Sequence, residues 1–242
     1  MELLDGVISE DLFIYLPKYS VFILSDVHLG YEESLNRKGV LIPRNNYSDL
    51  VLRLEKTLER IKKKNTIEKI VINGDLVHEF GKVSRIDREL INKFINFLSR
   101  YGEVILIEGN HDKAIKYVIK KNIEIVDKLN FGKISIMHGD KIPSKDLIKE
   151  SKTIIIGHEH PAVNIKSGVR VEKYKCFLKG IYERKNLIVM PSCNLFIEGT
   201  DVLCEKLLSP ILKKSKLMDF EVYIVEDKIY DFGKLKSLLN KF

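Results

Sequence analysis

Long hydrophobic runs are missing from this sequence. Its longest apolar stretches, such as residues 21–24 (VFIL) and 70–72 (IVI), are far shorter than the roughly 20 residues that a transmembrane helix needs. The first residues, MELLDGVISEDLF, carry acidic side chains where a secretory signal peptide carries basic ones. Both absences argue against a membrane span and against secretion, so we expect a soluble globular protein with no membrane partner.

Cysteine is also scarce. The three cysteines, Cys176, Cys193 and Cys204, are too few and too scattered for a disulfide framework or a CxxC metal site. Unpaired thiols are typical of a reducing compartment, and we therefore expect a cytoplasmic protein. The sequence contains neither a Ser–His–Asp signature nor a P-loop pattern, since the stretch NFGKIS lacks the P-loop spacing.

Positive charge is in moderate excess. The 242 residues include 41 Lys and Arg against 34 Asp and Glu, which gives a net charge of +7. A basic surface attracts phosphate-bearing partners. The lysines are nevertheless spread along the chain in short clusters such as Lys62–Lys64 and Lys213–Lys214. This spacing favours a solvated lysine-rich surface over a dedicated nucleic-acid stripe.

Short runs rich in Val and Ile predict buried strands at 21–25, 69–73, 103–108, 133–137 and 153–157. Two amphipathic stretches separate the first three runs and predict helices near 47–63 and 85–99. Their expected buried faces are Leu50, Leu54, Leu58 and Ile61 in the first helix, and Ile86, Leu90, Phe94 and Phe97 in the second. Strands that alternate with helices predict a mostly parallel sheet. After residue 168 the strand-like runs have hairpin spacing and predict a second, more antiparallel sheet within one domain.

All six histidines follow one of the five apolar runs within a few residues. They are His28, His78, His111, His138, His158 and His160, and they are accompanied by Asp26, Asp75, Asn110, Asp112 and Asp140. Ligands of open α/β sheets bind beyond the carboxyl ends of the strands, so these side chains should meet at one rim. A single histidine after a strand is most often structural. Chance placement of all six would instead scatter them into helices and loops.

Imidazoles combined with carboxylates and a side-chain amide suit divalent transition metals. No cysteine accompanies them, which argues against a structural zinc site. The set contains more ligands than one ion needs, whereas two ions roughly 3.5–4 Å apart would use them with one bridging carboxylate. Asp75 is the natural bridge, because it follows the second strand, which should be central in the sheet.

Five motifs, SDVHLG, NGDLVH, EGNHD, MHGD and GHEHP, resemble the five blocks of the calcineurin-like metallophosphoesterases in order and spacing. The stretches HLGYEESLNRKGVLIPR, KCFLKG and LIVMPSCNLFIEG are similar to compact phosphoesterases related to the Mre11/SbcD nucleases, including those associated with bacterial DNA ligases. The resemblance covers nearly the whole chain. It implies one domain over residues 1–242 with an α/β fold of the αββα type, a two-sheet β-sandwich of mixed strands flanked by helices. The capping domain of the Mre11/SbcD proteins finds no room here, so exonuclease activity does not follow.

The resemblance also implies roles for individual residues. One ion would bind Asp26, His28, Asp75 and His160, and the other would bind Asp75, Asn110, His138 and His158. His111 would act as a general acid or phosphate contact, with Asp112 orienting its ring. His78 and Arg44 would contact the substrate, or would support the metal ligands without binding an ion themselves. Glu159, between the last two histidines, would be solvated.

The expected activity is hydrolysis of nucleotide or nucleic-acid phosphodiesters by a hydroxide held between two divalent ions. Two alternatives stay open: a phosphomonoesterase with the same metal centre, and a non-catalytic metal-bearing module that binds DNA-repair proteins. Manganese is the expected ion, since the family often uses it and mixed His, Asp and Asn ligands suit it. Nickel, iron and zinc remain alternatives, and the sequence leaves the oligomeric state open.

Overall fold

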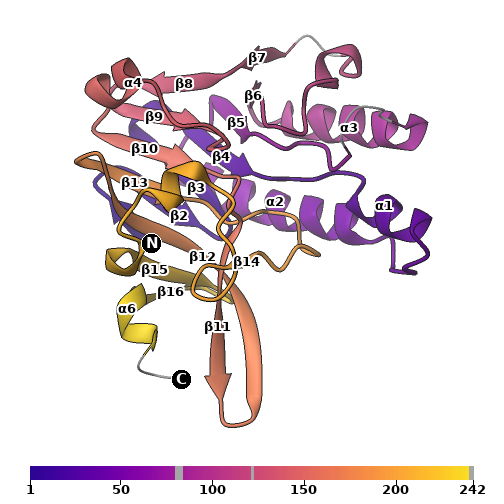
Figure 1. The fold of residues 1–242 in the computed structure, drawn as a ribbon. Helices are drawn as coiled ribbons and strands as arrows, with labels where there is room; N and C mark the ends of the chain where they lie inside the picture. Colours follow the sequence, from indigo (N-terminus) through magenta and orange to yellow (C-terminus); the bar gives the residue numbers. More distant parts are fainter. Residues whose placement is uncertain (80–83, 121–122, 240–242) are drawn as a thin grey trace.

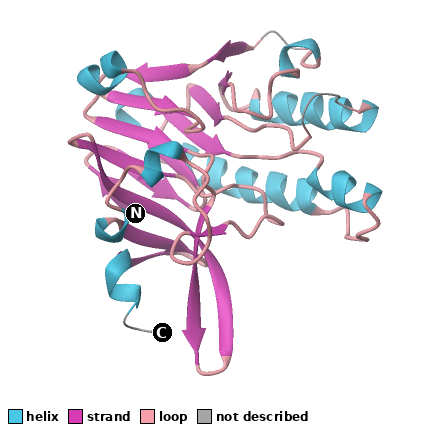
Figure 2. Ribbon diagram, in the orientation of Figure 1, coloured by secondary structure: helices cyan, strands magenta, loops and turns pink. Residues whose placement is uncertain are grey.

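The computed structural model describes residues 1–79, 84–120 and 123–239. Two β-sheets lie against each other with helices on both sides (Figures 1 and 2). One side carries α1 (Tyr31–Arg37), α2 (Asn46–Lys62) and α3 (Arg85–Leu98), and the other carries α4 (Lys145–Glu150), α5 (Pro210–Lys213) and α6 (Leu235–Leu238). This arrangement confirms the predicted two-sheet α/β fold. Among the described residues, none of the helices reaches the length and apolarity that a bilayer crossing needs.

The first sheet has the order β1-β2-β3-β4-β5-β6-β7. Its strands are β1 (Glu2–Leu4), β2 (Val7–Glu10), β3 (Phe13–Leu16), β4 (Val21–Ser25), β5 (Lys69–Asn73), β6 (Glu103–Ile107) and β7 (Glu124–Val126). Neighbours from β4 to β7 pair in parallel, as the strand–helix alternation predicts. The antiparallel meander β1–β3 was not predicted, because its strands have only three or four residues each.

The second sheet follows the order β14-β11-β12-β13-β10-β9-β8, with β15 and β16 attached through β12. Its strands are β8 (Lys128–Phe131), β9 (Ile134–Met137), β10 (Thr153–Ile156), β11 (Pro161–Ser167), β12 (Arg170–Tyr182), β13 (Lys185–Val189), β14 (Thr200–Asp201), β15 (Glu221–Val225) and β16 (Ile229–Lys234). This sheet begins earlier than the change of pattern after residue 168 suggested. Only Asp127 separates β7 from β8, so the chain changes sheets without a crossover helix.

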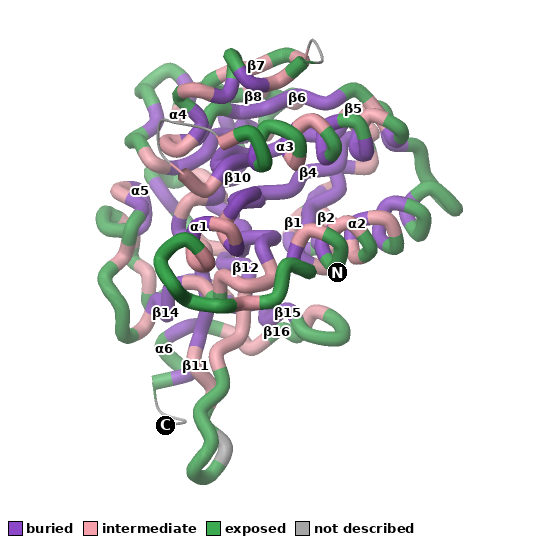
Figure 3. The backbone as a smooth tube through the Cα atoms, turned by 90° about the vertical axis from the view of Figure 1, so that its right-hand side faces the viewer, coloured by how far each residue is buried: buried purple, intermediate pink, exposed green. Residues whose placement is uncertain are grey.

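Strand β10 shows how the second sheet is buried on both faces. Ile155 packs into the core that lies between the two sheets, whereas Ile154 and Ile156 pack into a separate core on the outer face. Successive side chains of a strand point to opposite faces, and here both faces are apolar. The central strands of both sheets are therefore buried (Figure 3), which gives the side chains at their ends a rigid support.

Helix α3 matches its predicted range, but its predicted buried face is partly wrong. Ile86 is 52% exposed, whereas Asp87 and Ile91 are buried. The cause is a capping box: Ser84 Oγ accepts from the Asp87 amide, and the Asp87 carboxylate accepts from the Ser84 amide. This contact turns Asp87 toward Gly30, where an added Cβ would lie 2.4 Å from Asp87 Oδ1.

Three short 3-10 helices complete the described structure: η1 (Pro17–Tyr19), η2 (Ile115–Tyr117) and η3 (Leu217–Asp219). Helix η2 follows β6 and the motif EGNHD, so it lies in the segment that leaves the predicted site.

Candidate metal centre

The expected ligands come together at the carboxyl ends of strands from both sheets. Strand β4 is followed by Asp26 and His28, β5 by Asp75, β6 by Asn110, β9 by His138, and β10 by His158 and His160. The sequence predicted one rim built from five strand ends. The structure divides that rim between three ends of the first sheet and two of the second. The site therefore lies where the two sheets meet.

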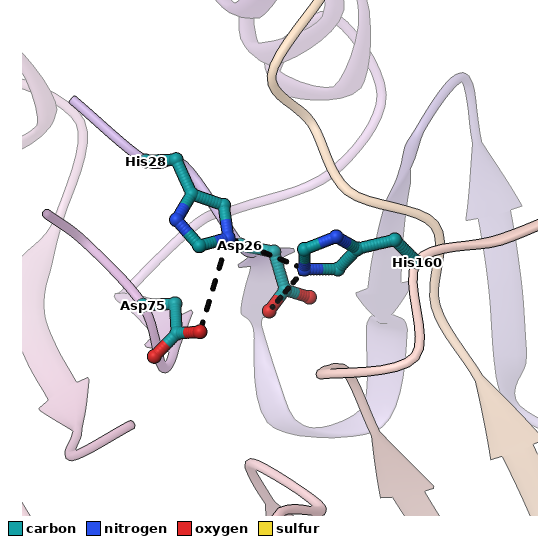
Figure 4. A group of neighbouring side chains, drawn as sticks. All are labelled: Asp26, His28, Asp75 and His160. Atoms are coloured by element: carbon teal, nitrogen blue, oxygen red, sulfur yellow. Dashed lines mark hydrogen bonds and ion pairs between the residues drawn. The ribbon is translucent and has the colours of Figure 1, made fainter. Parts of the chain in front are cut away.

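A first group of donor atoms comes from Asp26, His28, Asp75 and His160 (Figure 4), and all of these atoms lie within 4.8 Å of one another. Nε2 of His160 is 3.2 Å from Oδ1 of Asp26 and 3.2 Å from Nε2 of His28. Nε2 of His28 is 3.8 Å from Oδ2 of Asp75. Two carboxylates and two imidazole nitrogens that face a common point fit a divalent transition metal.

A second group shares Asp75 and adds His138 and His158. Nε2 of His138 lies 3.4 Å from Oδ2 of Asp75 and 3.2 Å from Nδ1 of His158. The amide oxygen of Asn110 is 3.1 Å from the same Nε2 atom of His138. The seven expected ligands thus divide into the two predicted sets, with Asp75 in both.

The backbone at these ligands is strained. Five of them adopt a positive φ between 47° and 64°, namely Asp26, His28, Asp75, His158 and His160. Residues other than glycine rarely adopt this left-handed conformation, which costs on the order of 1–3 kcal/mol each. Backbone hydrogen bonds hold two of the turns together, from the His28 amide to the Asp75 carbonyl and from the Asp26 amide to the Gly74 carbonyl. Strain concentrated at one cluster is typical of a functional site.

Two glycines allow the ligands to pack directly against the backbone. A Cβ added to Gly74 would lie 2.1 Å from Nδ1 of His138, and one added to Gly109 would lie 2.2 Å from Oδ1 of Asp75. Any larger residue at either position would displace a ligand. These two motif glycines therefore have a steric role in the centre.

Most of the titratable side chains in the cluster have the protonation state that binds a cation. Burial lowers the pKa of His28 to about 3 and that of His158 to about 4, so both rings are neutral at neutral pH. Burial alone would raise the pKa of Asp26, but the neighbouring histidines, His160 first, outweigh it and hold this pKa below its ordinary value. Neutral imidazoles and ionised carboxylates are the forms that bind metals.

His138 is the exception. Burial would lower its pKa, but the hydrogen bond to Asp75 and the charges of Asp26 and Asp75 outweigh burial and raise the pKa to about 9. A cation that binds this ring at neutral pH must therefore displace a proton.

His111 points into the centre without belonging to either donor group. Its backbone amide donates to Oδ1 of Asp75 at 3.0 Å, and its Nε2 lies 3.8 Å from Oδ2 of the same residue. Its Nδ1 lies 2.5 Å from the carbonyl oxygen of His78. A carbonyl can only accept, so Nδ1 carries the proton and Nε2 is directed at the site.

Asp112 makes a different contact from the predicted one. Its buried carboxylate accepts hydrogen bonds from the backbone amides of Leu76 (3.0 Å), Val77 (3.3 Å) and Gly109 (3.0 Å). It thus ties the loop after β5 to the loop after β6, and the His78 carbonyl takes the ring-orienting position beside His111 that was expected of Asp112. Burial and the charge of Asp75 raise the pKa of Asp112 to about 7.

His78 and Arg44 lie apart from the donor atoms. The His78 ring is centred 5.6 Å from that of His28 and 6.0 Å from that of His111, beside the centre and outside both donor groups. Arg44 is 70% exposed and forms an ion pair with Glu33, Nη2 to Oε2 3.0 Å. A substrate contact remains a prediction for both residues.

Glu159 was expected to be solvated, and this expectation is wrong. The residue is fully buried, and its carboxylate accepts from the backbone amides of Leu208 (2.9 Å) and Ser209 (2.7 Å). It anchors the turn between His158 and His160 to the start of α5. A contact with residues almost fifty positions later leaves no local signal in the sequence.

Two supporting residues were missed. Ser192 Oγ donates to the Asp26 carbonyl at 2.7 Å, and Asn194 Nδ2 donates to the carbonyls of Val27 (3.0 Å) and His28 (3.2 Å). Both lie in the stretch LIVMPSCNLFIEG, which carries part of the family resemblance. That resemblance was the available signal, but it did not indicate a role for either residue.

Comparisons with known proteins identify a family and a shared fold. The model of the calcineurin-like phosphoesterase family matches residues 19–190. A solved nuclease of Pseudomonas putida, MPE, is 18% identical, with 92% of each chain covered and a TM-score of 0.60. This likeness shows a shared fold.

Two other solved structures match with lower TM-scores. A protein of unknown function from Aquifex aeolicus is 20% identical over 58% of this chain and 78% of its own, with a TM-score of 0.36. The phosphoesterase Yfce of E. coli is 14% identical over 86% and 88% of the two chains, also with a TM-score of 0.36. A search among curated protein sequences finds no match.

Proposed function

The chain belongs to the calcineurin-like phosphoesterase family, and on this premise we propose that it hydrolyses phosphodiesters of nucleotides or nucleic acids with two divalent ions. The observation that carries the proposal is the pair of donor groups that share Asp75. A centre with one bridging carboxylate is typical of enzymes that cleave phosphate esters with two metals.

Asp26, His28, Asp75 and His160 would hold one ion, and Asp75, Asn110, His138 and His158 would hold the other. When bound, two such ions supply a water of lowered pKa and neutralise the non-bridging phosphoryl oxygens. Ligands that mix imidazole with carboxylate and amide oxygens favour manganese in this proposal. The buried carboxylates of Asp26 and Asp75 supply the negative charge that a cation needs.

His111 is the proposed general acid. The His78 carbonyl keeps one proton on Nδ1, so to act as the acid the ring must carry a second proton on Nε2, which faces Asp75 and delivers that proton. Expulsion of a poor leaving group requires a proton on its oxygen, and a histidine suits this task near neutral pH. Because its backbone amide is bound to the Asp75 carboxylate, the ring is held next to the metal ligands without being one of them.

The diester preference draws support from the fold shared with MPE, which is described as a nuclease. The cytoplasm remains the proposed compartment, since Cys176, Cys193 and Cys204 are all unpaired. DNA-repair proteins remain proposed partners.

The test begins with metal-free protein and adds each divalent ion separately. Chromogenic phosphomonoesters and phosphodiesters, cyclic nucleotides and DNA would serve as substrates. The proposal predicts metal-dependent cleavage of diesters, fastest with manganese. Cleavage of monoesters alone would support a phosphatase, and no cleavage of any substrate with any ion would support a non-catalytic module.

A further inference from the structure

A groove next to the candidate centre is lined mainly by positively charged side chains. It lies between helix α3 and residues 117–120 and has a volume of about 720 Å³. The charged residues that line it are Arg85, Arg88, Glu89, Lys93 and Lys120. None of the seven expected metal ligands is among its lining residues, so the groove is separate from the centre.

Hydrogen bonds hold the two walls together. Asn92 on α3 donates through Nδ2 to the Val118 carbonyl at 3.1 Å, and its Oδ1 accepts from the Lys120 amide at 2.8 Å. The segment after η2 is thereby fixed along the outer side of α3, which lies on the right in Figure 1. The groove is thus a built feature of the fold.

The connectivity places one end of the groove near the centre. Strands β5 and β6 are parallel, so the chain returns along α3, and the helix must begin at the edge where β5 ends. Asp75 lies at that same edge. The opposite wall, residues 117–120, begins six positions after His111 along the chain.

The charge around the groove is far more basic than that of the chain as a whole. Helix α3 exposes Arg85, Arg88 and Lys93 against one acid, Glu89, and residues 113–120 expose Lys113, Lys116 and Lys120. Of the residues that line the groove itself, four are cations (Arg85, Arg88, Lys93 and Lys120) and one is an anion (Glu89), whereas the full chain has 41 cations against 34 anions. The fold therefore gathers basic residues that are dispersed in the sequence into a surface suited to a polyanion.

An aromatic side chain stands on this surface. Tyr117 is 78% exposed, and Lys116 Nζ lies 5.2 Å from the centre of its ring. Basic grooves flanked by exposed aromatic rings bind single-stranded nucleic acids, because phosphates pair with the cations and bases stack on the rings. An acidic peptide would use the cations alone, so Tyr117 favours nucleic acid.

We propose that this groove binds a single-stranded segment of the nucleic-acid substrate that extends away from the scissile phosphodiester, with a base stacked on Tyr117. This inference rests on the proposed function and extends it from small diesters to strands that reach from the centre to the groove.

The first test measures binding of a fluorescent oligothymidylate of about 12 nucleotides by anisotropy, with a chelator present so that no cleavage occurs. Tyr117→Ala should raise Kd roughly 5- to 150-fold, as expected for the loss of one base stack. The matched control is Tyr230→Ala. Tyr230 lies on strand β16 and, like Tyr117, has a lysine over its ring, with Lys228 Nζ 5.0 Å from the ring centre. This control should leave Kd unchanged.

The second test addresses the phosphates. The double variant Arg85→Gln/Lys120→Gln should reduce the slope of log K against log salt by about 1.4, since each phosphate contact to a single strand contributes about 0.7. The control pair Lys214→Gln/Lys216→Gln lines a different hollow of about 670 Å³ and should keep the slope of the unmodified protein.

Turnover of a small chromogenic diester separates this inference from the proposed function. The groove variants should keep that turnover while losing cleavage of the oligonucleotide. If the unmodified protein cleaves no diester, the proposed function fails, and the binding data still test the groove. Oligonucleotide binding unaffected by Tyr117→Ala and by the double variant would overturn the inference, as would equal binding of polyglutamate.

Discussion

Oδ2 of Asp75 lies 3.4 Å from Nε2 of His138, and this contact joins residues that follow strands of different sheets. The same oxygen is 3.8 Å from Nε2 of His28, which belongs to the other donor group. The centre therefore forms only when the two sheets pack together, and Asp75 is the residue on which both halves depend.

Asp75→Asn should accordingly cause a greater loss of activity than any other single ligand substitution, because it weakens the binding of both ions. Turnover at saturating manganese, compared across the seven ligand variants, measures this. Asp140→Asn is a suitable control, since this motif aspartate belongs to neither donor group. Near-normal turnover of Asp75→Asn would refute the bridging role.

Replacement of His111 should affect chemistry and leave ion binding intact. We expect His111→Ala to keep both ions and to lose roughly 10²–10⁴-fold in turnover on a substrate with a poor leaving group. The loss should shrink for a nitrophenyl diester, because its leaving group needs no proton. Parallel assays on the two substrates, with metal content determined in the same samples, provide the measurement.

Two outcomes would count against the acid role of His111. An equal loss on both substrates would mean that the residue binds phosphate and does not donate a proton. A loss of metal would mean that it is a ligand or a structural residue.

Binding of an ion to the donor group that contains His138, called here the second ion, should release a proton. The pKa of His138 is raised to about 9, so its ring is protonated at neutral pH and must lose that proton before it can bind an ion. The affinity for the second ion should therefore rise with pH and level off above about pH 9. The first ion displaces no proton from His28, whose pKa is about 3.

Calorimetric titration with manganese at about pH 7, in buffers of different ionisation enthalpy, counts the released protons. We expect about one proton for the second ion. Affinities that do not change between about pH 6 and pH 9 would contradict the assignment of His138 as a ligand.

Glu159→Ala should destabilise the protein and weaken ion binding together. The substitution leaves the amide of the buried Ser209 without its acceptor, at a cost of about 1–3 kcal/mol, removes the acceptor of the Leu208 amide as well, and frees the turn that holds His158 and His160. Urea denaturation and metal titration measure the two effects. Glu150→Ala, at an exposed site, is the control, and equal stability of the two variants would contradict the anchoring role.

The sequence predicted where the expected ligands lie, because each motif directly follows a short run rich in Val and Ile. Such runs form buried strands, and the strand ends fix the positions of residues that immediately follow, as for Asp26 after β4 and His138 after β9. Periodicity also predicted α2, whose residues Leu50 and Leu54 are fully buried. These features depend on neighbours in the chain.

Features that depend on distant residues were not predictable in this way. The amides that bind Glu159 lie almost fifty positions later, and two of the three amides that bind Asp112 lie in the loop after β5, more than thirty positions earlier. The sheet to which β9 belongs depends on the direct step from β7 to β8, which hydrophobic patterns do not reveal. The basic residues around the groove are dispersed in the sequence, and only the fold brings α3 beside residues 117–120.

Anomalous diffraction from crystals soaked in manganese tests the central claim most directly. Our account predicts two peaks roughly 3.5–4 Å apart on either side of Oδ2 of Asp75. One peak should contact Asp26, His28 and His160, and the other Asn110, His138 and His158. A single peak, or peaks bound away from Asp75, would contradict the two-metal centre.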